Sequence, residues 1–228
     1  MPRRVDDYRG LTQPSRLRLL RAVQSHPGMR VAELAERCGM PLNTARDHLR
    51  VLVQEGLVRE ERLHVGSRGR PPIAYHPVRE ADSNPAARRR VDGARRRGAL
   101  LRAVMPPTPA DAALRGDTEA ETQLDVLYEH LDDAGLSPVL DEPALRFEMM
   151  PCRYRGMIAQ DQATVCGAHA RLVRDTLAQV DGPLEVERLE PFVTADTCAL
   201  LLRRGEHRGR TASDPVSAPP PPESRSAR

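Results

Sequence analysis

The stretch VAELAERCGMPLNTARDHLRVLVQEGLV, residues 31–58, decides the fold of the N-terminal part of the chain. Residues 30–38 place apolar side chains at the three- and four-residue spacing of a short amphipathic helix. The sequence GMP, residues 39–41, interrupts the pattern, and residues 42–55 resume it until Gly56 ends the second helix. The pattern therefore predicts two short helices joined by a tight, glycine-containing turn.

The flanking residues extend this pair of helices to a larger unit. Residues 14–26 have the same helical spacing, residues 57–63 and 73–78 have the character of strands, and a small basic loop, GSRGRP, joins the strands at residues 66–71. Three helices followed by a β-hairpin is the order of a winged helix-turn-helix, whereas an ordinary three-helix bundle would lack the hairpin. We therefore assign residues 14–78 to a DNA-binding domain.

The second helix of a helix-turn-helix enters the major groove of DNA. Its outward side chains must reach bases and phosphates, and asparagine and arginine can hydrogen-bond base edges through two atoms at once. An arginine-bearing loop tip can lie in a narrow minor groove, although the same loop is also compatible with a hairpin that only faces solvent. The expected DNA contacts are Leu42, Asn43, Thr44, Arg46, Asp47 and Arg50 in the helix and Arg68 and Arg70 in the loop.

Charge divides the chain into two halves. All 35 basic residues are arginine; residues 1–104 contain 22 of them against 11 Asp and Glu, and residues 105–228 contain 13 against 21. A basic half joined to an acidic half predicts one face for nucleic acid and another turned away from it. The chain has no run of 18 apolar residues and no apolar leader at its N-terminus, so we expect a cytoplasmic protein without a membrane span.

The rest of the chain predicts an α+β, mainly helical protein with a second α+β domain for sensing and dimerisation. A basic helix at residues 85–104 and a helix at 117–135 are expected to build a homodimer. The remaining elements are an extended segment at 139–150, a helix at 161–180 and strands at 184–192 and 197–203. The predicted boundaries are an arm at 1–13, the DNA-binding domain at 14–78, the basic helix and linker at 79–116, the second domain at 117–203 and a disordered tail at 204–228.

Three cysteines and one histidine in the second domain follow the pattern C-x13-C-x2-H-x28-C, which comprises Cys152, Cys166, His169 and Cys198. Cys166 and His169 lie three residues apart, on one face of a helix. Soft thiolates and an imidazole from different elements suit an iron–sulfur cluster or a tetrahedral zinc ion. The spacing matches neither a zinc finger nor a ferredoxin, and each cysteine alone is more often a small buried apolar residue. Metal binding and an apolar role therefore both stay open on pattern alone.

Two resemblances add to this prediction. Residues 14–78 resemble the winged helix-turn-helix of ArsR and DeoR-like regulators, a resemblance that implies a homodimer on a palindromic DNA operator. ArsR-type metal sensors often carry a cysteine pair in their helices, and here only Cys38 lies in that region, so we expect Cys38 to be a core residue.

The second half is similar to the C-terminal half of the SufR-type iron–sulfur repressors and their actinobacterial relatives. The similar segments are QLDVLYEHLDDAGLSPVLDE, PCRYR, VCGAHARLVRDTL, GPLEVERLEPFV and TC. The resemblance implies a [4Fe–4S] cluster bound by Cys152, Cys166 and Cys198. It leaves the fourth ligand open, with His169, Asp161 or an external ligand as the candidates.

The sequence thus predicts a DNA-binding transcription regulator and repressor, not an enzyme, whose operator binding depends on an iron–sulfur cluster. The alternatives are a structural zinc site at the same residues and a metal-free thiol-redox switch. An enzyme that uses Cys166 as nucleophile and His169 as base is disfavoured, because no third orienting group is evident in the sequence.

Overall fold

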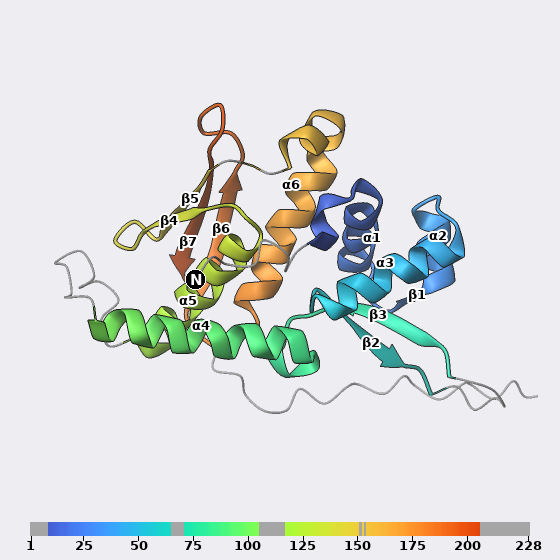
Figure 1. The fold of residues 1–228 in the computed structure, drawn as a ribbon, viewed down its shortest axis with the longest axis horizontal. Coiled ribbons are helices and arrows are strands. Elements are labelled where there is room, and N and C mark those ends of the chain that lie inside the picture. Colours follow the sequence, from blue (N-terminus) through green and yellow to red (C-terminus); the bar gives the residue numbers. More distant parts are fainter. Residues whose placement is uncertain (1–8, 65–70, 105–116, 151, 153, 206–228) are drawn as a thin grey trace, which may run out of the picture.

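The computed structural model describes residues 9–64, 71–104, 117–150, 152 and 154–205 of the 228-residue chain. These residues form six α-helices and two antiparallel sheets, which confirms the α+β, mainly helical class expected from the sequence (Figure 1). The predicted wing tip with Arg68 and Arg70, the predicted linker at 105–116 and most of the predicted tail lie outside the described residues.

The N-terminal unit is a winged helix-turn-helix with a three-stranded sheet of order β1-β3-β2. Its helices begin and end within one residue of the predicted bounds, because the spacing of buried leucines sets them. The two-residue strand β1 was not predicted. The elements are η1 (Arg9–Thr12), α1 (Pro14–Ser25), β1 (Met29–Arg30), α2 (Val31–Arg37), α3 (Leu42–Gln54), β2 (Val58–Arg62) and β3 (Ile73–Pro77).

The C-terminal unit packs helices against a four-stranded sheet of order β4-β5-β7-β6. The predicted extended segment at 139–150 is in fact the hairpin of β4 and β5, whose register pairs Val139 with Glu148. The elements are η2 (Ala81–Ser83), α4 (Pro85–Val104), α5 (Thr118–Asp133), β4 (Pro138–Asp141), β5 (Arg146–Met149), α6 (Arg155–Leu177), β6 (Leu184–Glu190) and β7 (Cys198–Arg204).

Helix α6 starts earlier than the predicted helix at 161–180. It begins at Arg155 and is kinked at Asp161, whose φ of −156° and ψ of 79° are not helical. The Asp161 side chain accepts a hydrogen bond of 3.0 Å from the backbone N–H of Thr164, the contact of a helix N-cap. The predicted start at residue 161 therefore corresponds to the cap of the longer, second segment of α6.

The two units share one hydrophobic core. A single cluster of buried side chains extends from Leu19 and Leu49 in the winged helix-turn-helix to Phe147 and Leu200 in the second sheet. Figure 1 shows α6 between the four-stranded sheet and α1. Helix α6 thus connects the DNA-binding unit to the rest of the chain.

Helices α4 and α5, predicted to build a dimer, pack against each other within one chain. Arg102 forms an ion pair of 2.8 Å with Asp125, and Arg97 forms one with Glu129. The helices approach closely at Gly98, where a Cβ would overlap with the Asp125 carboxylate. Part of the positive charge of α4 is therefore neutralised by α5 rather than left for DNA.

Candidate nucleic-acid interface and cysteine site

Helix α3 presents the predicted DNA-contacting residues on its outer face. Ala45, Leu49 and Leu52 are fully buried, and the opposite face is polar apart from Leu42, which is 42% exposed. Among the other predicted DNA-contacting residues of α3, Thr44 is half-buried, and the side chains that are exposed are Asn43, Arg46, Asp47 and Arg50. The amphipathic pattern thus orients α3 as a recognition helix requires.

The outward side chains of α3 are paired along the helix. Arg46 donates a 2.9 Å hydrogen bond to the Asn43 carboxamide oxygen, and Arg50 donates one of 2.9 Å to the Asp47 carboxylate. The Asp47–Arg50 pair is well exposed, so water screens it and it contributes little to stability. Both arginines can exchange these partners for phosphate or guanine at small cost.

Polar contacts that the sequence did not predict hold α3 in place. Ser15 of α1 forms a hydrogen bond of 2.9 Å with the His48 ring of α3, and both residues are half-buried. At the other end, the guanidinium of Arg90 in α4 binds the backbone carbonyls of Glu55 and Gly56. These carbonyls end α3, where a cation is favourable to the helix dipole. α3 is therefore fixed by α1 and by α4.

The wing strands β2 and β3 pair in antiparallel register from Val58↔Pro77 to Arg62↔Ile73. The tip of the hairpin, with Arg68 and Arg70, is outside the described residues, so its DNA contact stays a prediction. Arg59 pairs with Glu61 at 2.9 Å.

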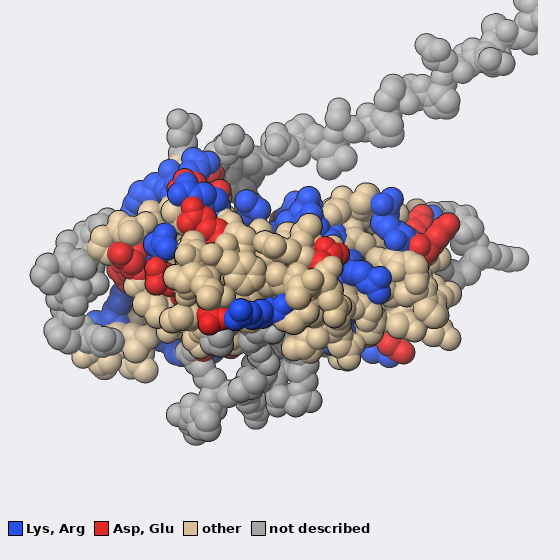
Figure 2. Space-filling model, turned by 90° about the horizontal axis from the view of Figure 1, so that it is seen from above, with Lys and Arg blue, Asp and Glu red and all other residues tan. Residues whose placement is uncertain are grey.

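In the view of Figure 2, basic and acidic side chains alternate over the surface and do not form one continuous basic face.

The three cysteines of the second half come from three different elements. Cys152 follows β5, Cys166 lies inside α6, and Cys198 begins β7, where it pairs with Met149 of β5 in the sheet. The Cys152 thiol donates a hydrogen bond to the sulfur of Cys198, and Cys166 interacts electrostatically with both. All three are half-buried and unbridged. Thiols up to 46 positions apart in the sequence thus lie close enough to interact electrostatically.

The shared hydrogen bond separates the acidities of the two thiols. It lowers the pKa of Cys198 to about 6, because the Cys152 proton stabilises the Cys198 thiolate. The same bond, together with burial, raises the pKa of Cys152. Burial raises the pKa of Cys166 as well. The arrangement favours one thiolate among the three sulfur atoms.

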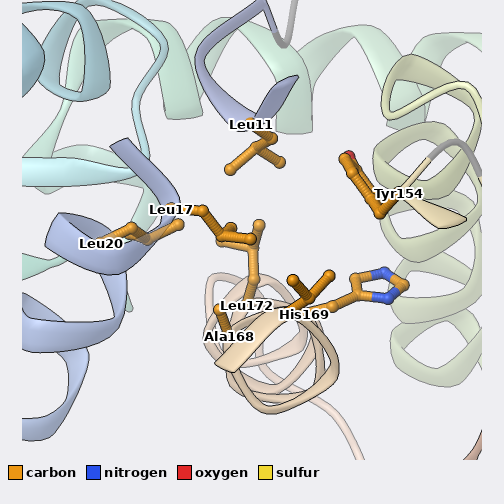
Figure 3. Close-up of a pocket in the computed structure, with 8 residues that line it drawn as sticks. Leu11, Leu17, Leu20, Tyr154, Ala168, His169 and Leu172 are labelled. Atoms are coloured by element: carbon orange, nitrogen blue, oxygen red, sulfur yellow. The ribbon is translucent and has the colours of Figure 1, made fainter. Parts of the chain in front are cut away.

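His169, the predicted fourth ligand, has different neighbours. Its ring lies 6.3 Å from the Tyr154 ring, and it interacts with His130 of α5. Burial lowers its pKa to about 4, and its Nε2 has no hydrogen-bond partner among the described residues. Figure 3 shows His169 and Tyr154 beside a small apolar cavity that Leu11, Leu17 and Leu172 also line.

The described residues contain no group of three or more His, Cys, Asp or Glu side chains placed around one metal ion. Three cysteine thiols are nevertheless the donor type that a thiophilic group such as an iron–sulfur cluster requires, so the residue types fit while the arrangement shown is not that of a formed metal site. Cys38 lies apart from them, directly after α2; it is half-buried, its thiol is 3.9 Å from the Arg18 carbonyl oxygen, and it packs against the core rather than inside it.

Comparison with known proteins bears on the N-terminal unit. Residues 11–61 match the model of a helix-turn-helix domain, a range that contains α1, α2, α3 and most of β2. Neither the curated proteins nor the solved structures include a match to the chain. With the orientation of α3, the match identifies a helix-turn-helix domain in the N-terminal unit and supports a DNA-binding transcription regulator. Among the described residues, each helix is too short or too polar to cross a lipid bilayer.

Proposed function

We propose that the chain is a cytoplasmic, homodimeric repressor whose binding to a palindromic operator depends on an iron–sulfur cluster held by Cys152, Cys166 and Cys198. The observation that supports the proposal is the electrostatic interaction among these three thiols, one of which lies on α6, the helix that packs on the DNA-binding unit. His169, Asp161 and an external ligand remain the candidates for the fourth position.

The chemistry of the site supports a redox-active group. When bound, the cluster would supply a reactive centre that oxidants or iron shortage can remove. The protein would hold it through thiolates, and the lowered pKa of Cys198 favours one thiolate at neutral pH. Half-buried positions leave the sulfur atoms accessible to small molecules while they shield them from bulk water.

One observation favours an alternative, a metal-free thiol switch. The thiols of Cys152 and Cys198 interact with each other, and a two-electron oxidant would convert such a pair of thiols to a disulfide with release of two protons. A structural zinc ion would use the same thiols, but it is redox-inert. An enzyme based on Cys166 and His169 gains no support, since the interacting neighbours of Cys166 are thiols and those of His169 are Tyr154 and His130.

Dimerisation belongs to the proposal because a single recognition helix reads a short stretch of bases. Two copies would place their α3 helices about one turn of DNA apart, roughly 34 Å. The last turn of α4 exposes Leu100, Leu101 and Val104, apolar side chains available to a second copy.

The experiment that tests the proposed function is selection of duplexes from a random DNA library by the anaerobically purified protein. We expect an enriched palindrome, bound by two chains, with affinity that differs between the cluster-loaded and cluster-free protein. Enrichment of no sequence would contradict the DNA-binding proposal. Enrichment of a sequence that both forms bind equally would contradict only the control by a cluster.

A further inference from the structure

The contact between α6 and α1 lies directly beside the cysteine site. Cys166 is followed in α6 by Gly167 and Ala168, whose backbone carbonyls accept hydrogen bonds from Arg21 (3.4 Å) and Gln24 (3.3 Å) of α1. Arg171, one turn further along α6, donates to the Gln24 carbonyl over 3.0 Å.

The contact is close and well buried. Gln24 is 3% exposed and Ala168 is fully buried. A Cβ at Gly167 would lie 3.2 Å from the guanidinium carbon of Arg21, nearer than ordinary van der Waals contact. The absence of a side chain at Gly167 thus lets α1 approach α6 at the residue next to Cys166, and a shift there of an ångström would disrupt the hydrogen bonds.

A second contact joins α1 to the other end of the cysteine segment. Tyr154, two residues after Cys152, lines the apolar cavity of Figure 3 together with Leu11 and Leu17 of the DNA-binding unit. Leu172 of α6 also lines this cavity. Two of the three candidate ligands, Cys152 and Cys166, are therefore within two residues of side chains that touch the DNA-binding unit.

The far end of α6 is fixed to the winged helix-turn-helix by separate contacts. Arg79, just after β3, pairs with the buried Asp175 at 2.8 Å, and Gln179 donates to the Val78 carbonyl over 3.2 Å. A displacement of α6 near Cys166 would therefore act mainly on α1. From α1 it reaches α3 through the Ser15–His48 hydrogen bond and the packing of the two helices.

We propose that the α1–α6 interface, built by Arg21, Gln24 and Arg171, transmits the state of the three thiols to the recognition helix. The inference rests on the proposed function and names its internal route. Filling the site draws Cys152, Cys166 and Cys198 onto one group, and the movement of the segments that carry them changes how α1 supports α3. Coupling between two sites in a protein typically alters affinity about 5- to 150-fold.

The test loads the full-length chain with ferrous iron and sulfide without air and follows backbone hydrogen exchange by mass spectrometry. In the wild-type protein we expect loading to change exchange in peptides from α1 and α3 as well as from α6. In the double variant Arg21→Ala/Gln24→Ala, loading should still change exchange in α6 but leave α3 unaltered. Arg37→Ala, an exposed arginine on α2, is the matched control and should behave like wild type.

A parallel readout uses the duplex selected by the wild-type protein. The cluster-loaded and cluster-free forms of the wild-type protein should bind this duplex with affinities that differ at least about fivefold. In the double variant the ratio of these two affinities should approach one. Arg171→Ala breaks the contact from the α6 side and replaces the double variant if that variant does not melt cooperatively.

The possible failures are distinguishable. Loading that leaves α1 and α3 unchanged in wild type, or a variant that transmits like wild type, would overturn this inference and leave the proposed function intact. A wild-type protein that takes up no iron and sulfide would overturn the cluster proposal and this inference with it.

Discussion

The buried side-chain amide of Gln24 donates a 3.3 Å hydrogen bond to the carbonyl oxygen of Ala168, a residue 144 positions away and two residues beyond Cys166. This contact joins the helix that supports the recognition helix to the helix that carries a candidate ligand. The two halves of the chain share a core at this place, so the structure provides a direct mechanical connection between the cysteines and the DNA-binding unit.

The close approach of α4 and α5 predicts opposite effects for two glycines of one helix. Gly98→Ala should lower the free energy of unfolding by about 1–3 kcal/mol, because the new Cβ overlaps with the carboxylate of Asp125. Gly93→Ala, on the same helix, should raise it by about 0.5–1 kcal/mol, because the new Cβ would make only an ordinary contact of 3.9 Å with the Arg97 side chain. Urea unfolding followed by circular dichroism measures both, and equal effects of the two substitutions would contradict the packing described here.

Replacement of Asn84 should lower the free energy of unfolding more than replacement of an ordinary helix cap. It is 4% exposed; its Nδ2 donates to the carbonyls of Val53 and Val58, and its Oδ1 accepts from Ala86 N–H at 2.8 Å as the cap of α4. Asn84→Ala should therefore cost about 2–3 kcal/mol in urea unfolding, more than the roughly 1 kcal/mol of an ordinary cap.

The matched control for Asn84 is the cap of α5. Asp117 accepts from the Ala120 N–H at 3.0 Å and pairs with Arg204 at 2.8 Å, but its side chain is more exposed than that of Asn84. Asp117→Ala should cost about 1 kcal/mol. A smaller loss for Asn84→Ala than for Asp117→Ala would contradict the bridging role of Asn84.

Two buried histidines predict a loss of stability in acid. Burial lowers the pKa of His169 to about 4 and that of His130 well below its usual value, with further lowering of the latter by His169 and Arg90. Below about pH 6.5 both rings are protonated in the unfolded chain but stay neutral in the folded chain. The free energy of unfolding therefore falls as the pH is lowered toward 4. A shift of one pKa unit corresponds to about 1.4 kcal/mol of stability, so the shifted pKa of His169 alone accounts for a loss of up to about 3 kcal/mol in the free energy of unfolding at low pH.

Melting temperatures of the cluster-free protein between pH 7.5 and 5 measure this effect. His130→Gln cannot take up the proton and should flatten the pH profile, whereas His64→Gln, at an exposed position beyond β2, should leave it as in wild type. A wild-type melting temperature that does not change over this range would contradict the burial of the two rings as neutral groups.

The wing prediction has its own test in the salt dependence of DNA binding. Each phosphate contact contributes about −0.9 to the slope of log K against log salt. Arg68→Ala and Arg70→Ala should each reduce the magnitude of the slope by about one, and Arg188→Ala, an exposed arginine on β6, should not change it. Asn43→Ala should instead weaken discrimination between bases with little change of slope. An unaltered slope in both wing variants would remove the wing from the interface.

The sequence predicted the elements of the winged helix-turn-helix because local spacing of apolar residues determines them. Leu49 and Leu52 must face inward on any helix of this pattern, so Asn43 and Arg46 must face outward. The cap at Asp161 was also encoded locally, although the turn of helix before it was not anticipated.

The local spacing of apolar residues does not predict contacts between segments that are far apart in the sequence. Nothing in the local sequence around Arg21 or Gln24 indicates a partner near residue 168, and nothing around Arg97 or Arg102 indicates their acidic partners on α5. Cysteine spacing suggested a common site, but the different surroundings of His169 depend on how α5 and α6 pack.

The measurement that tests the central claim most directly is the absorption spectrum of anaerobically purified protein, with iron, acid-labile sulfide and zinc quantified on the same sample. We predict a brown wild-type protein containing iron and sulfide, retained in Cys38→Ser and lost in Cys152→Ser, Cys166→Ser and Cys198→Ser. A colourless wild-type protein, with zinc or with no metal, would contradict the account, as would a Cys152→Ser variant that keeps the full iron and sulfide content.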